Sequence, residues 1–428
     1  MNTDLINWDE DLAVDSEEEY QAILNGLTRS QGFSLYFVQC SPFSSGKLIK
    51  RVQNDLIDKT ISTLKFEHSI VDGNVFKRVN AFLQEHDSEV LFVQGLENSL
   101  AAAAETKKRL GWSWEKIEKL NWHDVPPVLN NLNQQRERFR DAFQTCFVFL
   151  LPQYALNYLI HRAPDFFDWR SGLFKYVADP KLLARESDRI LTESDYAAYC
   201  SWSQEERDQR LLEIQSLLEI SHADLADLHL EQGLIFAAYK AHDSAVLAYD
   251  SALAIQPDYP NALYNKGTSL SDLGRYEEAI AAYDAALEIE PDDHEALYNK
   301  GNALADLDRH EAAIAAYDAA LAIKPDDHET WDNRGYSLAV AGHLDKAILS
   351  FDKAIEINPQ HANALYKKAY ALSKKGDLET AFSLLQQAFE IDPKYREMAQ
   401  TDADFDSIRD DPQFQALLAS SEALENQG

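Results

Sequence analysis

The sequence predicts two folds in one chain, an α/β domain with a mainly parallel sheet followed by an all-α solenoid of helical repeats. The first fold is predicted by apolar runs that alternate with helical segments in the first half of the chain. The second is predicted by prolines that recur every 34 residues, at Pro257, Pro291, Pro325, Pro359 and Pro393. A chain of 428 residues is also long enough for two or three domains.

Four apolar runs in the first half have the length and composition of buried strands. They are FSLYFV at 33–38, ISTLKFEH at 61–68, EVLFVQG at 89–95 and CFVFLL at 146–151. Helical segments lie between them, and the one before the last run has helical spacing through Leu129, Leu132 and Phe139. Because strands and helices alternate, we expect a sheet covered by helices on both faces.

The repeats are predicted to be pairs of helices. Small residues recur where two helices must approach closely, at Gly233, Gly267, Gly301, Gly335 and Ala369. Large residues recur with the same period at Tyr249, Tyr283, Tyr317, Phe351 and Leu385, and the proline ends each second helix. This period and these positions are typical of tetratricopeptide repeats, of which we expect five, at 226–259, 260–293, 294–327, 328–361 and 362–395.

The rest of the chain is assigned around these two folds. We expect an acidic N-terminal tail at 1–14, the α/β domain at 15–179, a helical linker at 180–225, the repeats at 226–395, and a capping helix and C-terminal tail at 396–428. The linker has an apolar stripe and should dock the α/β domain against the first repeat. The aromatic block APDFFDWRSGLFKYV at 163–177 is expected to pack at the domain edge.

The concave face of such a solenoid is lined by first helices and suits an extended peptide or a partner helix. In other tetratricopeptide proteins, an asparagine at the sixth repeat position holds the backbone of a bound peptide, although the repeat consensus alone also accounts for asparagine there. The resemblance implies a partner-binding groove formed by Tyr264, Asn265, Tyr298, Asn299, Asn302, Asn333, Tyr336, Tyr366, Lys367 and Tyr370. Replacing Asn299 and Asn333 should then weaken binding and leave folding little changed.

Two specialised sites are not expected in the repeats. The clamp for the C-terminal carboxylates of heat-shock chaperones needs Lys and Arg at groove positions where this chain has Asp227, Asn261, Glu295, Glu329 and Asn363. The acidic pairs at 292–293 and 326–327 are expected to be helix N-caps rather than a metal site. We therefore predict no chaperone clamp, no metal and no cofactor.

The stretch QCSPFSSGKLIKRV at 39–52 follows a predicted strand and resembles a phosphate-binding loop. The order of parts over residues 15–180 resembles the STAND-class NTPases of bacterial, especially cyanobacterial, tetratricopeptide proteins, so the resemblance implies a P-loop NTPase-like domain. Its motifs are degenerate: Ser41 replaces the first glycine, Leu48 the hydroxyl residue that binds magnesium, and Gln94 the metal-holding aspartate, with Glu97 following. The remaining candidates for a nucleotide or anion site are Ser45, Gly46 and Lys47, which equally fit an ordinary strand-to-helix turn.

Charge and composition narrow the class of partner. A formal net charge of −32 disfavours nucleic acid and anionic membranes. The N-terminus lacks the pattern of a secretory signal, and no apolar run has the length of a membrane helix, so we expect a cytoplasmic protein. The three cysteines, Cys40, Cys146 and Cys200, match no metal or redox spacing and are expected to be buried structural residues.

The function predicted from the sequence is a cytoplasmic protein interaction scaffold without enzyme activity. A pseudo-NTPase domain would be joined to a groove that binds a protein or peptide. The alternative is a nucleotide-dependent signalling or defence switch, similar to STAND proteins, that still binds ATP through Lys47. A third possibility is an enzyme whose site lies elsewhere in the first domain, although no local catalytic signature is present.

Overall fold

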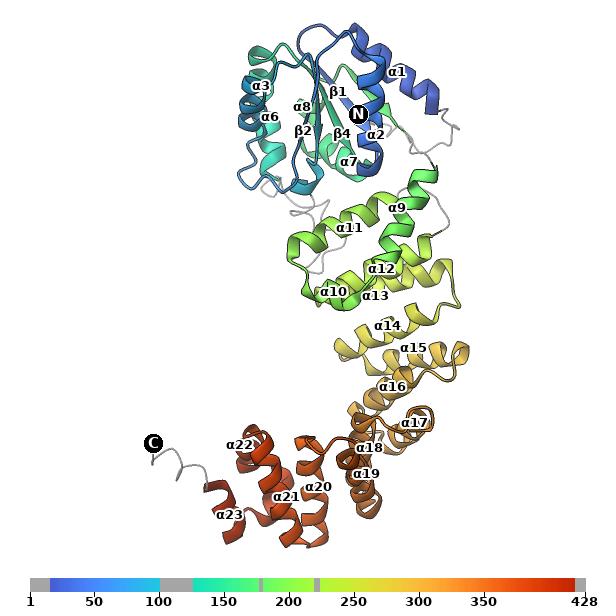
Figure 1. Ribbon diagram of the computed structural model, residues 1–428, viewed down its shortest axis with the longest axis vertical. Helices are drawn as coiled ribbons and strands as arrows, with labels where there is room; N and C mark the ends of the chain where they lie inside the picture. The colour runs from blue at the N-terminus through green and yellow to red at the C-terminus, as the bar shows by residue number, and fades with distance from the viewer. Residues whose placement is uncertain (1–15, 101–125, 177–179, 219–223, 420–428) are drawn as a thin grey trace, which may run out of the picture. The chain divides into compact units, whose positions relative to one another are not determined.

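The computed structural model describes residues 16–100, 126–176, 180–218 and 224–419. The chain forms two compact units, Met1–Ile255 and Gln256–Gly428. The first contains the sheet, the linker helices and the first helix pair of the repeats, and the second contains the remaining repeats and their cap (Figure 1). The predicted fold class, an α/β domain followed by stacked helical hairpins, is confirmed.

The sheet has five strands in the order β2-β3-β4-β1-β5, and all the described pairings are parallel. The strands are β1 (Ser34–Gln39), β2 (Ile61–Lys65), β3 (Val90–Gln94), β4 (Cys146–Leu151) and β5 (Gly172–Lys175). The first four coincide with the predicted apolar runs. The edge strand β5 was not predicted and comes from the aromatic block, where Phe174 stacks on Tyr36 of β1.

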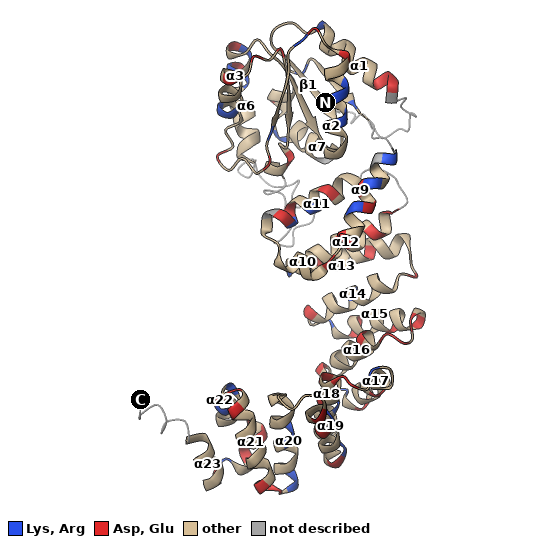
Figure 2. Ribbon diagram, viewed as in Figure 1, with Lys and Arg blue, Asp and Glu red and all other residues tan. Residues whose placement is uncertain are grey.

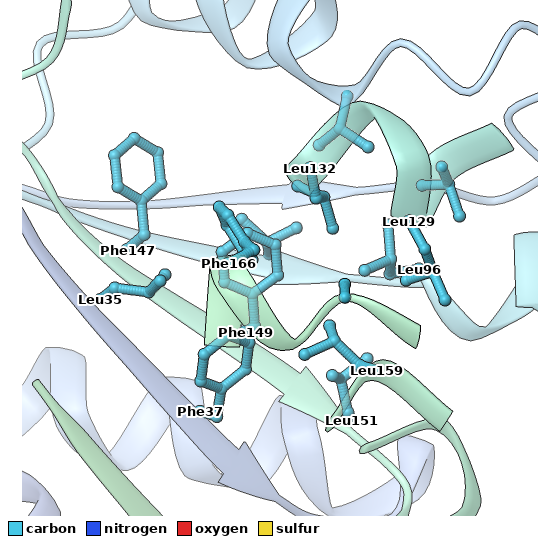
Figure 3. Close-up of a cluster of buried hydrophobic side chains, with 14 of the residues drawn as sticks. Leu35, Phe37, Leu96, Leu129, Leu132, Phe147, Phe149, Leu151, Leu159 and Phe166 are labelled. Carbon is cyan, nitrogen blue, oxygen red and sulfur yellow. The ribbon is translucent and has the colours of Figure 1, made fainter. Parts of the chain in front are cut away.

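Helices cover both faces of the sheet, as expected. On one face lie α1 (Ser16–Arg29) and α2 (Pro42–Asp55), which pack on Val38, Phe92 and Val148. On the other lie α3 (Val75–Glu85), α6 (Pro127–Ala142), α7 (Gln153–Arg162) and α8 (Pro164–Phe167). They enclose the aromatic core of Figure 3, where Phe149 contacts both Phe37 and Phe166. Alternate residues of each strand face opposite cores because the side-chain period of a strand is two.

The linker forms α9 (Pro180–Thr192), α10 (Tyr196–Ser201) and α11 (Gln204–Leu218). All three helices contact α12 (Leu225–Ala238), the first helix of the first repeat, whose partner is α13 (His242–Ile255). Helix α9 also contacts α2, so the linker joins the α/β domain to the first repeat as predicted. Cys40 and Cys146 are buried, but Cys200 on α10 is exposed, so the prediction that all three cysteines are buried is wrong for Cys200.

The second unit stacks four helix pairs. They are α14 (Pro260–Asp272) with α15 (Tyr276–Ile289), α16 (His294–Asp306) with α17 (His310–Ile323), α18 (His328–Val340) with α19 (Leu344–Ile357), and α20 (Ala362–Lys375) with α21 (Leu378–Ile391). The acidic pairs provide N-caps as predicted: Asp293 accepts the backbone N–H groups of Glu295 and Ala296, and Asp327 accepts that of Glu329.

The last repeat is covered by the predicted cap. The cap consists of α22 (Lys394–Thr401), a 3-10 helix (Ala403–Ile408) and α23 (Pro412–Ala419), rather than one helix and a tail. Phe405 and Phe414 are fully buried and complete the core of α20 and α21. No helix in the described parts of the chain is both long enough and apolar enough to cross a membrane.

Candidate partner groove and sheet-edge pocket

The first helices of the second unit form a continuous row. Helix α16 contacts α14 and α18, and α18 contacts α20, in addition to the contacts of each helix with its own partner. The structure brings nine of the ten predicted groove residues onto this row with partly or largely exposed side chains. Tyr366 is the exception, because it is buried against Tyr395 and Phe405 of the cap and its hydroxyl donates to Asp402.

Side chains on this row bond from one repeat to the next, and we call this set the inter-repeat ladder. Asn299 Nδ2 donates to the Tyr264 hydroxyl at 3.1 Å, and Asn333 Nδ2 donates to the Tyr298 hydroxyl at 3.0 Å. In the next step Lys367 Nζ donates to Asp332 Oδ2 at 2.9 Å. Asn299 and Asn333 therefore join neighbouring repeats, which the sequence analysis did not foresee.

Asp332 is the most buried charged group of the ladder, with 3% of its side chain exposed. Its Oδ2 accepts from Asn363 at 2.7 Å and from Lys367, and His361 Nε2 lies 3.5 Å away. Burial alone would raise the pKa of Asp332, but His361 and Lys367 outweigh burial and lower the pKa below its usual range. The carboxylate is thus held in its charged form inside the repeat stack.

A pocket of about 660 Å³ opens on the row between α16 and α18. Its lining includes Asn302, Asn333, Tyr336 and Lys367, which were predicted as groove residues, together with Asp306 and Ser337, which were not. Asn302 is held in place because its Oδ1 accepts from Tyr317 at 2.8 Å and from Asn333 at 3.1 Å. Tyr336 is 38% exposed and is the most accessible aromatic ring of this set.

A second pocket, of about 410 Å³, lies in the first unit at the carboxyl ends of β1, β2, β3 and β4. This edge is where open parallel sheets commonly bind ligands. The lining includes Cys40 and Ser45 after β1, Lys65 at the end of β2, Gln94 at the end of β3 and Glu97 after it. The predicted candidates Gly46 and Lys47 are not among the described lining residues.

The local geometry explains why Gly46 and Lys47 lie elsewhere. Helix α2 begins at Pro42 with Ser41 as its N-cap, so the glycine–lysine pair lies inside the helix instead of in the turn before it. Pro42 has no backbone N–H, and the amides of Ser44 and Ser45 donate to the Ser41 carbonyl at 3.0 and 3.1 Å. The first helical turn therefore offers few free amides to a phosphate.

The residues at the two positions that would hold a metal make other contacts instead. Gln94 Nε2 donates to Ser45 Oγ at 2.5 Å, and Ser45 Oγ lies 2.6 Å from the Pro42 carbonyl, to which it donates. Leu48 is fully buried on the side of α2 that packs against the sheet. Among the described residues, no group of three His, Cys, Asp or Glu side chains is arranged to hold a metal ion.

Glu97 is the unusual group of this pocket. It is 7% exposed, and its Oε2 has no hydrogen-bond partner among the residues that the structure describes. Burial raises its pKa to about 7, although the backbone amides of Glu97 and Gly95 and the charge of Lys65 act in the opposite direction. An acidic residue shortly after a buried strand was the one sequence signal for this site.

Comparison with known proteins identifies the repeats. Models of the tetratricopeptide repeat match residues 264–328, 328–361 and 350–382. Similar solved structures include a crystal structure of MamA, with 26% identity over 39% of this chain and 96% of that chain and a TM-score of 0.37. MamA from Desulfovibrio magneticus RS-1 has 22% identity over 41% and 98% of the two chains, with a TM-score of 0.39.

A third similar structure is YrrB, described as a tetratricopeptide protein with an unusual peptide-binding site. It has 24% identity over 42% of this chain and 92% of that chain, with a TM-score of 0.39. Comparison with the curated proteins gives no match. Residues 264–382 of this chain therefore consist of tetratricopeptide repeats.

Proposed function

We propose that this protein is an interaction scaffold that binds a protein or peptide partner in the groove of its first helices. The observation that carries the proposal is the pocket between α16 and α18, which presents a half-exposed tyrosine beside ordered amide groups. Aromatic side chains in such settings are enriched among residues that dominate binding energy. Tetratricopeptide repeats support this function because a stack of helix pairs offers an extended surface for an extended ligand.

The test replaces one residue of the pocket and one matched residue outside the row. The full chain is used as bait to capture a partner from its native cells, and the affinity of the purified partner is then measured by calorimetry. Tyr336→Ala should weaken binding by about 2 kcal/mol or more, since it removes an accessible aromatic anchor. Leu349→Ala, which removes a side chain 65% exposed on the second helix α19, should leave the affinity unchanged.

Two results would contradict the proposal. One is an equal effect of both substitutions on the affinity, which would show that the pocket has no special role. The other is undiminished binding by a chain that ends at Ile255, because recognition would then belong to the first unit.

We further propose that the α/β domain is a pseudo-NTPase and that the protein is not an enzyme. Supporting observations are the start of α2 at Pro42, the burial of Leu48 and the hydrogen bond between Gln94 and Ser45. With leucine at position 48 and glutamine at position 94, the two side chains that would hold magnesium are missing, and the charge on a transferred phosphoryl group would not be stabilised.

The prediction is that the purified protein turns over neither ATP nor GTP above background, with or without magnesium. Magnesium-dependent turnover that disappears in Lys47→Ala would contradict it. Calorimetry with ATP and ADP tests the alternative of a nucleotide-dependent switch, which requires binding that depends on Lys47.

A further inference from the structure

We infer that the groove selects a basic segment, with a lysine or arginine side chain of the partner entering the pocket beside Tyr336. The inference rests on the proposed function and adds the chemistry of the partner. It follows from a difference between two sides of the first helices. The basic side chains that face the preceding repeat are paired, whereas the carboxylates at the pocket are not.

The basic side chains on the side of the first helices that faces the preceding repeat are neutralised. Lys300 pairs with Asp284, Arg334 with Asp318, and Lys368 with Asp352, each at 2.5 Å and each with a carboxylate on the second helix of the preceding repeat. Inside the row, Lys367 is neutralised by the buried Asp332. These basic groups therefore contribute little attraction for an acidic partner.

The carboxylates at the pocket have no such compensation. Asp306 and Asp308 line the pocket and are exposed, and neither has a Lys or Arg partner among the described residues. Asp308 Oδ1 lies 3.7 Å from Nε2 of His310, which also lines the pocket. Its φ of +57° places it at the left-handed turn between α16 and α17, where the other repeats of this unit have glycine. Figure 2 shows the acidic residues of these helices in red.

The cap adds acidic groups on the same side. Burial raises the pKa of the Tyr336 hydroxyl, and the carboxylates of Asp404, Asp402 and Asp308 raise it further. Asp404 and Asp402 belong to the segment after α22, so acidic groups from two separate parts of the unit act on one exposed ring. A cation near this ring would meet a negative potential and a π face together.

Two residues that line the pocket have a buried polar atom without a hydrogen-bond partner among the described residues, Ser337 Oγ and His310 Nδ1. Ser337 is fully buried and lines the pocket, and its Oγ has no hydrogen-bond partner in the described part of the chain. Serine hydroxyls within helices commonly bond to the carbonyl four residues earlier, which is not observed here. Rotation of the Ser337 side chain would bring this oxygen to the pocket surface, where it can accept from the ammonium or guanidinium N–H of a basic side chain.

The pocket already accommodates one cation at its margin. Lys367 Nζ lies 5.1 Å from the centroid of the Tyr336 ring, within the range of a cation–π contact. Because Asp332 neutralises this lysine, it does not offset the charge of Asp306 and Asp308. The volume of about 660 Å³ falls within the range of ligand pockets and exceeds what one side chain fills.

The experiment measures fluorescence anisotropy of labelled 12-residue peptides with the full chain at low ionic strength. Three peptides alternate alanine with lysine, glutamine or glutamate. Only the lysine peptide should bind, and its affinity should fall with added salt. Asp306→Asn with Asp308→Asn should weaken binding at least tenfold, and asparagine at 308 preserves the left-handed turn.

A matched control separates the pocket from the overall negative charge. Glu288→Gln with Glu290→Gln makes the same charge change at exposed positions at the end of α15, and binding should change less than twofold. An equal loss in both double variants would overturn the inference, since diffuse attraction would then explain binding. Failure of the lysine peptide to bind, or equal binding of the glutamine peptide, would also overturn it.

The inference and the proposed function can fail separately. If a captured partner loses affinity with Tyr336→Ala but is insensitive to the double aspartate variant, the groove is the binding site and the basic selectivity is wrong. If Tyr336→Ala has no more effect on the captured partner than Leu349→Ala, the proposed function is wrong as well.

Discussion

The glycines on the first helices of the repeats are explained at the level of single atoms. Each of Gly233, Gly267, Gly301 and Gly335 faces an aromatic ring from the second helix of its own repeat. A Cβ added at Gly301 would lie 2.5 Å from Cε1 of Tyr317, which is too close for any real contact. Helix propensity would favour alanine here, so packing rather than backbone conformation requires the glycine.

We therefore predict that Gly301→Ala destabilises the protein by about 1 to 2 kcal/mol, because overpacking outweighs the gain in helix propensity. Gly46→Ala provides the contrast, since a Cβ at Gly46 in α2 would have no atom within 4 Å. That change should stabilise the protein by about 0.5 to 1 kcal/mol. Thermal unfolding of the two variants measures both effects, and the same sign in both would contradict the packing explanation.

Glu97 gives a prediction about pH. Its pKa rises from an ordinary value near 4.5 to about 7 on folding, so the folded state holds its proton more tightly than the unfolded state. The contribution of Glu97 protonation to the free energy of unfolding is fully present below pH 4.5. It is lost progressively as the pH rises towards 7 and is absent above pH 7. Glu97→Gln should therefore be more stable than the wild type at pH 8, by about 3 kcal/mol, and equally stable near pH 4. Urea unfolding at both pH values checks this, and a difference that does not change with pH would refute it.

At the scale of elements, the strands and repeats were predictable because their signals are local. Apolar runs mark β1 to β4, and the 34-residue period marks the helix pairs. Strand β5 was missed because it has only four residues, two of which are exposed. The glycine–lysine pair was misplaced because Ser41 and Pro42, a helix N-cap and a first helical residue, determine where α2 begins. The ladder was missed because contacts between residues 35 apart depend on how repeats stack.

Helix α20 contains two adjacent lysines whose roles differ. Lys367 neutralises Asp332, of which 3% is exposed, and Lys368 pairs with Asp352, of which 48% is exposed. Lys367→Met leaves a buried charge without its cation and should cost about 3 kcal/mol of stability. Lys368→Met removes a surface pair and should cost less than about 1 kcal/mol. Chemical denaturation of the two variants compares them directly, and similar losses would show that Asp332 does not depend on Lys367.

At the scale of the whole molecule, the chain consists of two compact units with separate hydrophobic cores. The aromatic core around Phe149 belongs to the first unit, and the core under Phe405 and Phe414 belongs to the second. Domains with their own cores can unfold as separate units. We then expect substitutions in different cores to act independently.

We predict two calorimetric transitions for the full chain, each sensitive to one set of substitutions. Glu97→Gln at pH 8 should raise the transition temperature of the first unit only, because Glu97 follows β3 at the carboxyl end of the sheet of that unit. Gly301→Ala should lower the transition of the second unit only, because Tyr317 packs within its repeats. The double variant should show both shifts with their single-variant sizes. A single transition that both substitutions move would mean that the two units unfold together, and the stability of the groove would then depend on the protonation of Glu97.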